Sequence, residues 1–285
     1  MKQGDIVVRK SYGEDIQFRI ETIKGNLAVL RGLEVRLLAD APLSDLLPAP
    51  VTEEEIYRSW DAAAEQRTNE LLRYVEAARM QELKRDAGEE EDSQRLDETF
   101  ELPGKVLHLD GDLSYMRKCM QVYGRLKVPA EGHYVPEAEM ADFLQYILPH
   151  SRPDIVVITG HDGLDKHYVN KHDLSSYRNS HNFVKAVQVV RRYERNKDAL
   201  AVIAGACQSH FEALLQAGAN FASSPARILI HALDPVHVAV KMAYTSIRDT
   251  VKVREVLRQT QSGTRGMGGF ETRGSYRVGT PKVEG

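Results

Sequence analysis

The sequence predicts an α/β protein with a mostly parallel sheet and helices on both faces, and two observations support this fold class. Two apolar runs, 154–159 and 199–204, are too short for typical helices, are rich in branched residues, and are each followed by glycine. Such runs are typical of strands buried on both faces, the pattern of a parallel sheet. From Pro103 onward, segments of this kind alternate with helical patterns, as in repeated strand–helix–strand units.

Composition sets the broad class of the protein. The chain has 285 residues, of which 42% are hydrophobic and 28% charged, enough for one large domain with a sizeable core and a small second one. A net charge of −3 favours neither nucleic acid nor an anionic membrane as a partner. No run is long enough to span a membrane and no signal-peptide core is present, so we expect a cytoplasmic protein. Two cysteines fit a reducing compartment better than a disulfide framework.

The first predicted domain, residues 1–48, is a small β barrel of the SH3-like kind. Strand patterns at 5–9, 16–20 and 27–30 are separated by turn residues, a spacing typical of small barrels. The segment has no basic stripe with interleaved aromatic residues, so RNA is not an expected partner. Its role is open between docking of substrates and simple packing.

Residues 49–102 are predicted to be a helical and acidic linker. Pro48 and Pro50 mark its start, because prolines punctuate secondary structure. A helix is expected from the cap residue Thr52, through an acidic first turn, to about Arg85. The acidic run 89–92 is interpreted as a solvated stretch.

Residues 103–260 are predicted to form the α/β domain, and residues 261–285 a flexible tail rich in glycine and arginine. A loop is expected at 124–136, where prolines and a glycine interrupt the pattern. The expected strands are 105–109, 154–159, 199–204, 218–225 and 227–232, and the expected helices are 113–123, 137–148, 180–195, 209–216 and 235–250.

His161 and Cys207 follow the two apolar runs. Because ligands bind at the carboxyl ends of parallel strands, these two side chains are expected at one edge of the sheet. A thiol needs a base beside it to become a nucleophile, and an imidazole can supply one. The backbone N–H groups of Cys207 and Gly163 are the expected oxyanion donors. The sequence therefore predicts a cysteine nucleophile with a histidine base.

The other candidate residues have simpler interpretations. Cys119 shares one helical face with Met116, Met120 and Tyr123 and is expected in the core. The loop histidines His167 and His172 are expected on the surface, and His231 in a core strand. For His210 the sequence leaves open whether the side chain faces the interior or the solvent. No short-spaced ligand pair and no phosphate-binding glycine motif is present, so neither a metal nor an organic cofactor is expected.

The two blocks that end in His161 and Cys207 resemble those of the clan CD cysteine peptidases, which include caspases, clostripain, gingipains and separases. The spacing of 207 − 161 = 46 residues is close to the roughly 50 of caspases. The resemblance implies a caspase-like sheet. It also shows one departure, because Asp162 occupies the position directly after the histidine where glycine is usual. The second oxyanion donor is therefore open between Asp162 and Gly163.

Four blocks, 4–12, 107–112, 159–163 and 205–209, together resemble the YabG family of sporulation-specific peptidases. The resemblance implies cleavage of spore coat and cortex-associated proteins after arginine, in the mother cell of a sporulating bacterium, with self-cleavage also implied. The alternative is a non-catalytic assembly or scaffold protein of the spore coat, in which both strand-end residues merely pack. The oligomeric state is not fixed by these residues.

A substrate arginine needs a carboxylate in its pocket. The candidates at strand ends are Asp110, Asp112, Asp162 and Asp234, and Asp234 resembles the pocket acid of separase in its position. Each could instead be a helix cap or a turn residue. The arginines of the predicted tail, Arg265, Arg273 and Arg277, are the expected self-cleavage points, because proteolysis favours exposed segments.

Overall fold

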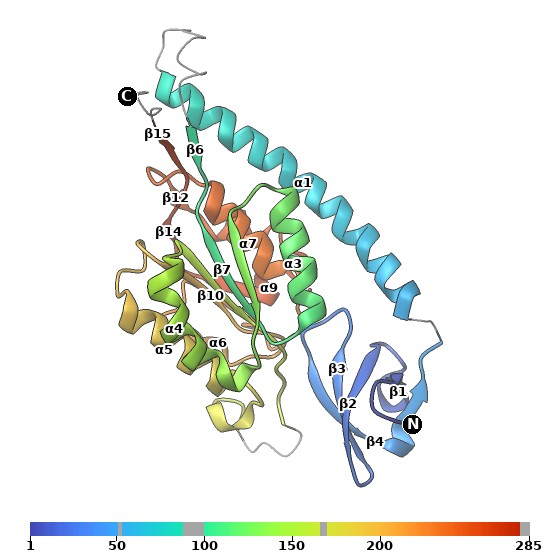
Figure 1. Ribbon diagram of the computed structural model, residues 1–285. Helices are drawn as coiled ribbons and strands as arrows, with labels where there is room; N and C mark the ends of the chain where they lie inside the picture. Colours follow the sequence, from blue (N-terminus) through green and yellow to red (C-terminus); the bar gives the residue numbers. More distant parts are fainter. Residues whose placement is uncertain (51–52, 88–99, 166–169, 280–285) are drawn as a thin grey trace.

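The computed structural model describes residues 1–50, 53–87, 100–165 and 170–279 (Figure 1). It consists of an N-terminal antiparallel sheet, one long helix and a larger α/β domain. Among the described helices, none combines the length and the apolar character needed to cross a bilayer. The predicted α/β fold class is confirmed.

The N-terminal sheet contains five strands in the order β4-β3-β2-β1-β5. Its strands are β1 (Ile6–Arg9), β2 (Phe18–Lys24), β3 (Leu27–Gly32), β4 (Leu38–Pro42) and β5 (Leu46–Pro48), with short 3-10 turns η1 (Lys10–Tyr12) and η2 (Leu43–Asp45). All neighbours are antiparallel. Burial alternates along β2, so one face of the sheet carries the apolar residues, as the sequence predicts. Closure into an SH3-like barrel stays a prediction.

The long helix α1 (Glu53–Ala87) connects the two parts of the molecule and runs along one side of it in Figure 1. It contacts α7 (Asp234–Tyr244), and its Leu71 and Val75 are buried. This confirms the helix expected in the linker. Thr52, the acidic run 89–92 and the side chain of Trp60 lie outside what the structure describes.

The sheet of the α/β domain has the order β13-β11-β10-β9-β7-β8, with β13 antiparallel to an otherwise parallel set. Its strands are β7 (Val106–Asp110), β8 (Ala130–Tyr134), β9 (Ile155–Thr159), β10 (Ala201–Ala204), β11 (Phe221–Ser223) and β13 (Met267–Gly269). Because β8 lies on one side of β7 and β9 on the other, the connections reverse direction there. Ligands bind at such a switch point in open α/β sheets.

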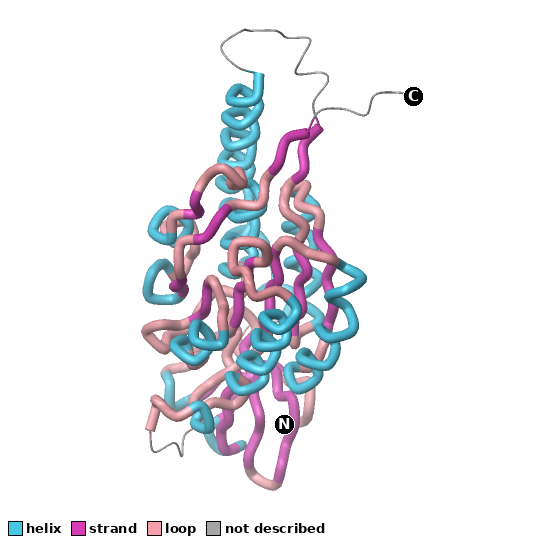
Figure 2. The backbone as a smooth tube through the Cα atoms, turned by 90° about the vertical axis from the view of Figure 1, so that its left-hand side faces the viewer, coloured by secondary structure: helices cyan, strands magenta, loops and turns pink. Residues whose placement is uncertain are grey.

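Helices cover both faces of this sheet (Figure 2). Helices α3 (Leu113–Arg125) and α7 pack on one face, with Val157 and Ile203 of the sheet pointing toward them. Helices α4 (Met140–Ser151), α5 (Ser180–Tyr193) and α6 (Phe211–Ala217) pack on the other, with Val156 and Val202 pointing there. Each of these strands therefore contributes side chains to two hydrophobic cores, one on each face of the sheet, which explains why its sequence is continuously hydrophobic.

Three local predictions are wrong. Residues 130–134, expected in a loop, form edge strand β8, since its residues pair with β7 although they are polar and only half-buried. Residues 227–232, expected as a strand, make only one isolated bridge, at His231. The last predicted helix ends at Tyr244 rather than near residue 250.

The predicted flexible tail is also wrong for residues 261–279. The remaining C-terminal elements are β12 (Thr250–Val251), α8 (Val253–Leu257), α9 (Gly263–Gly266), β14 (Thr272–Arg273) and β15 (Arg277–Gly279). Strand β13 completes the main sheet, and β15 pairs with β6 (Phe100–Leu102). Glycines here permit close backbone approach rather than disorder, because a Cβ at Gly269 would lie 2.3 Å from the Asn220 carbonyl oxygen. The division of the chain into domains stays a prediction.

Candidate active site

The parallel register of β9 and β10 brings His161 and Cys207 to the same edge of the sheet. Ile158 lies opposite Ala204, and each reactive residue follows its member of this pair by three positions. Both side chains are fully buried, with 0% exposure. Among the described contacts, no hydrogen bond joins imidazole and thiol directly. The two blocks that carry them instead share one backbone acceptor, the carbonyl oxygen of Arg36.

Backbone geometry positions Cys207. Gly205 has a φ of 108°, and Gln208 a φ of 56°, so the chain turns sharply on both sides of the cysteine, and glycine is favoured at the first turn. The Cys207 Sγ accepts a hydrogen bond of 3.2 Å from the Ile230 N–H and lies 3.6 Å from the Ile230 carbonyl oxygen. Burial raises the pKa of Cys207 to about 12. In this closed state the sulfur is therefore a neutral thiol.

The imidazole of His161 is held from several sides. Arg31 Nη1 lies 3.3 Å from Nδ1, and Nε2 lies 3.3 Å from the Gly32 carbonyl oxygen. Because arginine can only donate, Nδ1 is the acceptor and Nε2 carries the proton. The ring stacks on Tyr115 at 5.4 Å. Burial lowers the pKa of His161 to about 4, with Asp112 acting in the opposite direction, so the imidazole is neutral at pH 7.

Glu137, in the 3-10 turn η3 (Glu137–Glu139), fixes the backbone at the end of β9. Its Oε1 accepts a hydrogen bond of 2.9 Å from the His161 N–H. A Cβ on Gly160 would lie 2.6 Å from the same oxygen. Glycine is therefore required at 160 for this carboxylate to reach the backbone. Burial raises the pKa of Glu137.

The loop between β3 and β4, residues 33–37, crosses the carboxyl edge of the main sheet and covers the site. Its Arg36 carbonyl oxygen accepts hydrogen bonds from two backbone N–H groups, of Cys207 at 3.1 Å and of Asp162 at 3.2 Å. Isolated bridges join Leu37 to Asp162 and Val35 to His231. The Tyr115 hydroxyl donates to the carbonyl oxygens of Gly32 and Val35. The two blocks that carry the thiol and the imidazole therefore meet at one carbonyl of the N-terminal sheet.

The side chain of Arg36 enters the α/β domain, where it is fully buried. Its Nη2 lies 2.8 Å from Asp110 Oδ2 at the end of β7, and it donates to the Ala232 carbonyl oxygen at 2.9 Å. Thr159 also donates to Asp110 Oδ2, at 3.0 Å. Among the four aspartates expected at strand ends, Asp110 is thus the one that pairs with a guanidinium in the described contacts.

The other three candidates for the arginine pocket have different contacts. Asp112 caps α3 by accepting from the Ser114 and Tyr115 N–H groups. Burial opposes ionisation of Asp112, but His161 and these hydrogen bonds outweigh it and lower its pKa. The buried carboxylate of Asp162 accepts from the hydroxyls of Ser180 and Ser209. Asp234 accepts from the backbone N–H groups of residues 261 and 262.

Gly163, the other expected oxyanion donor, directs its N–H to the carboxylate of Asp162 at 2.9 Å. The N–H of Asp162 itself meets the carbonyl of Arg36. The two candidate donors that the sequence left open therefore differ. The Asp162 N–H shares the Arg36 carbonyl oxygen with the Cys207 N–H, and the Gly163 N–H does not.

The remaining histidines lie outside this cluster. His210 Nδ1 accepts from the Ala213 N–H and so caps α6, while Nε2 contacts the carbonyl oxygen of His172. The side chain of His172 is exposed. His231 is largely buried next to the bridge with Val35, and His167 lies outside the described residues.

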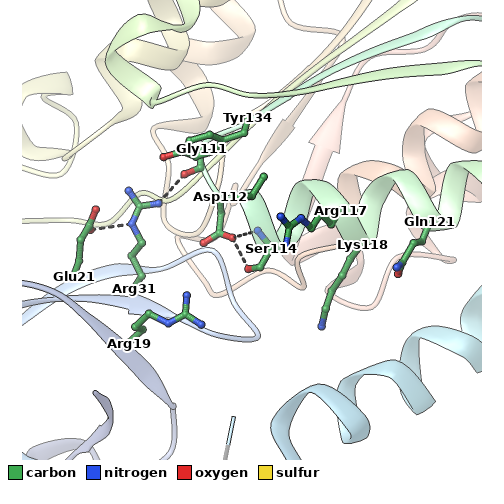
Figure 3. Close-up of a pocket in the computed structure, with 11 residues that line it drawn as sticks. Arg19, Glu21, Arg31, Gly111, Asp112, Ser114, Arg117, Lys118, Gln121 and Tyr134 are labelled. Atoms are coloured by element: carbon green, nitrogen blue, oxygen red, sulfur yellow. Dashed lines mark hydrogen bonds and ion pairs between the residues drawn. The ribbon is translucent and has the colours of Figure 1, made fainter. Parts of the chain in front are cut away.

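A groove of about 760 Å³ borders the site between the N-terminal sheet and α3 (Figure 3). Arg31 and Asp112 line it and also affect His161, through a contact and through charge respectively. Arg19, Arg117 and Lys118 give its walls positive charge. The groove approaches the imidazole from outside but stops short of it, since His161 is fully buried.

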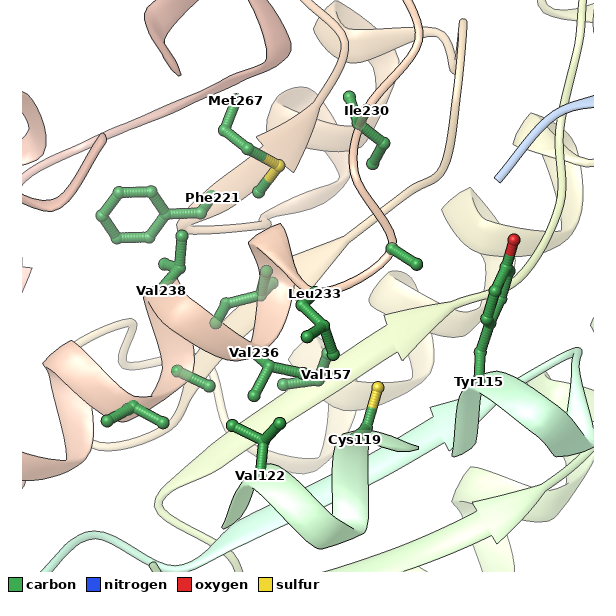
Figure 4. Close-up of a cluster of buried hydrophobic side chains, with 14 of the residues drawn as sticks. Tyr115, Cys119, Val122, Val157, Phe221, Ile230, Leu233, Val236, Val238 and Met267 are labelled. Atoms are coloured by element: carbon green, nitrogen blue, oxygen red, sulfur yellow. The ribbon is translucent and has the colours of Figure 1, made fainter. Parts of the chain in front are cut away.

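Three potential metal ligands, His108, Asp110 and Cys119, have donor atoms within 4.8 Å of one another. The guanidinium of Arg36 already lies at Asp110 and 3.9 Å from Cys119 Sγ, so a cation occupies this position. Cys119 is packed among the apolar side chains of α3, α7 and the sheet (Figure 4), and burial raises its pKa to about 12. The cluster therefore fits a guanidinium better than a metal ion.

Sequence reasoning missed Arg31, Arg36 and Tyr115 as parts of the site. Arg36 follows Gly32 in an apolar stretch between two strands of the N-terminal sheet, and no local pattern marks it. Tyr115 was assigned no role, although it shares a helix with Cys119. The one available signal for Arg36 was its position between the apolar residues Val35 and Leu37. An arginine in such a stretch is rarely buried without a charged or hydrogen-bonding partner, so a partner could have been expected.

A mostly parallel sheet with helices on both faces and a switch point at its carboxyl edge defines a doubly wound α/β protein. A family model described as YabG peptidase U57 matches residues 2–281. The chain is also 44% identical over 283 residues to a protein named sporulation-specific protease YabG from Bacillus subtilis (strain 168), covering 98% of this chain and 97% of that protein. The chain therefore belongs to the YabG peptidase family. No solved structure matches it.

Proposed function

We propose that the chain is a cysteine endopeptidase in which Cys207 is the nucleophile and His161 the general base. Membership of a peptidase family supports hydrolysis of peptide bonds. The placement of thiol and imidazole after neighbouring parallel strands supports these two residues as the reacting groups. The imidazole takes the thiol proton and later protonates the leaving amine, and the thiol forms an acyl-enzyme.

The carbonyl of Arg36 is the single observation that carries this proposal. It receives two backbone N–H groups, from Cys207 and Asp162, as the carbonyl of a cleaved bond does in an oxyanion hole. We therefore assign the second oxyanion donor to Asp162 rather than to Gly163. No metal or organic cofactor enters this mechanism.

Specificity for arginine is part of the proposal. The guanidinium of Arg36 is bound by Asp110, while Asp112, Asp162 and Asp234 cap or accept from nearby groups. We assign the pocket acid to Asp110, since a charge-assisted hydrogen bond to a buried carboxylate discriminates strongly for a cation. Spore coat and cortex-associated proteins in the mother cell are the proposed substrates, on the family relationship alone.

The test is cleavage of arginine-containing peptides by the full chain and three variants. Cys207→Ala and His161→Ala are expected to lose at least about 10³-fold in kcat/KM, because nucleophile and base act as one unit. His150→Ala, on the exposed surface of α4, is the matched control and keeps wild-type activity. Cleavage that is equal in all four proteins would remove the mechanism, and no cleavage by any of them would favour a scaffold protein.

A further inference from the structure

The groove beside the candidate active site carries more positive than negative charge. Its lining includes four cationic side chains and two carboxylates, namely Arg19, Arg31, Arg117 and Lys118, with Glu21 and Asp112. The whole chain has a net charge of −3, so the balance in the groove is opposite to that of the molecule. A groove with an excess of one sign attracts and orients ligands of the other sign. The expected ligand is therefore anionic.

The positive charge that a ligand can use lies mainly on the α3 side of the groove. Arg31 is already paired with Glu21 at 2.8 Å. Arg117, on the exposed side of α3, makes no hydrogen bond or ion pair with any residue that the structure describes. Arg19 from β2 and Lys118 from α3 extend from opposite walls into the space between sheet and helix (Figure 3). A carboxylate that enters this space therefore meets cations on both sides.

The loop that covers the site shows how a peptide chain reaches this groove from the arginine pocket. The side chain of Arg36 lies in that pocket, and Glu34 comes two positions earlier. Between them, the carbonyl oxygen of Val35 accepts a hydrogen bond from the Tyr115 hydroxyl of α3. Partial burial raises the pKa of Glu34, and the positive charge of Lys118 opposes this rise. The residue two positions before the arginine is thus within range of the charge on Lys118.

We propose that this groove is a substrate subsite for an acidic residue two positions before the arginine, with Lys118 as its main partner. The inference rests on the proposed function, because that function places the substrate arginine at Asp110. A substrate that takes the place of the loop brings its own carboxylate to Lys118, where Glu34 now lies. The substrate class is therefore protein segments in which an acidic residue, any residue and arginine follow one another.

The mixed lining of the groove favours a peptide over a nucleic acid. A nucleic acid presents an uninterrupted row of phosphates and is bound by many cations together. Here Glu21 and Asp112 interrupt the positive surface, so a polyphosphate chain would meet two like charges. A single carboxylate side chain on a peptide avoids both of them.

The subsite acts on binding rather than on the chemical step. An acidic residue two positions from the cleaved bond makes the same ion pair before and during the reaction. Interactions of this kind lower KM and leave kcat unchanged. Because the groove is open to solvent along the exposed Arg117, salt weakens the ion pair.

The test compares two peptides with the full chain, identical except for glutamate or glutamine two positions before a single arginine. Wild type is expected to prefer the glutamate peptide by about 5- to 10-fold in kcat/KM, between an exposed ion pair and a buried charged hydrogen bond. The difference lies in KM and disappears in about 1 M NaCl, where charges are screened beyond about 3 Å. Because both peptides meet the same preparation, the ratio does not depend on how much of the chain is folded.

Variants of α3 assign the preference to the groove. Lys118→Gln is expected to reduce the ratio to about 1, and Lys118→Glu to reverse it in favour of a peptide with lysine at that position. Arg117→Gln, at an exposed site, lowers the ratio about 2-fold and keeps the test decisive if the Lys118 variants fold poorly. The matched control is Arg192→Gln, at an exposed arginine of α5 on the opposite face of the sheet, which keeps the wild-type ratio.

Failure of this inference and failure of the proposed function give different results. Cleavage that depends on Cys207 but is equal for the glutamate and glutamine peptides overturns the subsite and leaves the cysteine peptidase standing. A glutamate preference that survives in Lys118→Gln and Arg117→Gln also overturns it. Absence of cleavage of both peptides by wild type removes the proposed function, and the subsite with it.

Discussion

At the scale of single residues, the proposed arginine pocket depends on one carboxylate, that of Asp110. Asp110 ends β7, accepts from Thr159, and binds the guanidinium of Arg36. Its neighbour His108 is fully buried, and burial lowers the pKa of His108 well below its usual range. The Asp110 carboxylate therefore lies beside a neutral imidazole, an arrangement that suits the arginine pocket proposed above.

Removal of this charge gives the first prediction. In an Arg36→Gln background, where no internal guanidinium competes, Asp110→Asn is expected to lower kcat/KM for arginyl peptides by about 10- to 100-fold, the value of a charge-assisted hydrogen bond. Asp234→Asn is the matched comparison, since its carboxylate contacts the backbone of residues 261 and 262. It is expected to leave the preference for arginine over glutamine peptides unchanged. Loss of the arginine preference in Asp234→Asn but not in Asp110→Asn would assign the arginine pocket to Asp234 instead.

At the scale of elements, the C-terminal strand β13 adds an antiparallel edge to the main sheet. It pairs antiparallel with β11 through Phe221, Ala222 and Ser223. The sequence here suggests a loop, because glycine occupies two of its three positions. Glycine is instead needed for close packing within the sheet. A Cβ at Gly269 would collide with the carbonyl oxygen of Asn220 and with the ring of Phe221.

A pair of glycine substitutions tests this role. Gly269→Ala would place a Cβ 2.3 Å from the Asn220 carbonyl oxygen, and an overpacked backbone contact of this kind is expected to cost about 1–3 kcal/mol of unfolding free energy. Gly124→Ala in α3 meets nothing within 4 Å and is expected to stabilise by about 0.5–1 kcal/mol, because alanine is the better helix former. Urea denaturation of both variants measures the difference. Equal stability would mean that residues 267–269 are not part of the sheet.

At the scale of the whole molecule, the domain buries several histidines in the neutral form. Burial lowers the pKa of His237 to about 3 and that of His231 and His161 to about 4. Within the described part of the chain, neither ring nitrogen of His237 has a hydrogen-bond partner. Because the pKa of each is lower in the folded state than in the unfolded chain, the folded state binds protons less readily. Their contribution to stability is therefore full above about pH 6.5 and is lost as the pH falls toward 4.

The corresponding prediction concerns thermal stability between pH 7 and pH 5. Each such histidine is expected to cost about 2 kcal/mol at pH 5, from the 1.5-unit distance below its unfolded pKa at 1.36 kcal/mol per unit. The melting temperature falls accordingly, and His237→Leu makes this fall smaller. His150→Gln, at an exposed position, leaves the slope unchanged. A melting temperature that is flat over this range would contradict burial of neutral imidazoles.

Local sequence is enough to predict the fold class, the long helix and the strands β7, β9 and β10. Runs such as 154–159 carry their own signal, since a strand buried on both faces needs apolar side chains at every position. The placement of His161 and Cys207 at one sheet edge follows from the same reasoning. Local sequence did not predict edge strand β8 or the C-terminal strands, because polar and glycine-rich strands form through pairing with neighbouring strands rather than through their own composition.

The sequence by itself determined that strands β7, β9 and β10 enter the sheet and that His161 and Cys207 follow two of them, because these features depend on patterns over a few neighbouring residues. Only the tertiary structure decided what meets them. Arg36 and Asp110 form their ion pair between two different sheets, and the Arg36 carbonyl oxygen accepts from the N–H groups of Cys207 and Asp162. Such contacts depend on how the N-terminal sheet packs on the α/β domain. The spacing of residues along the sequence does not determine that packing.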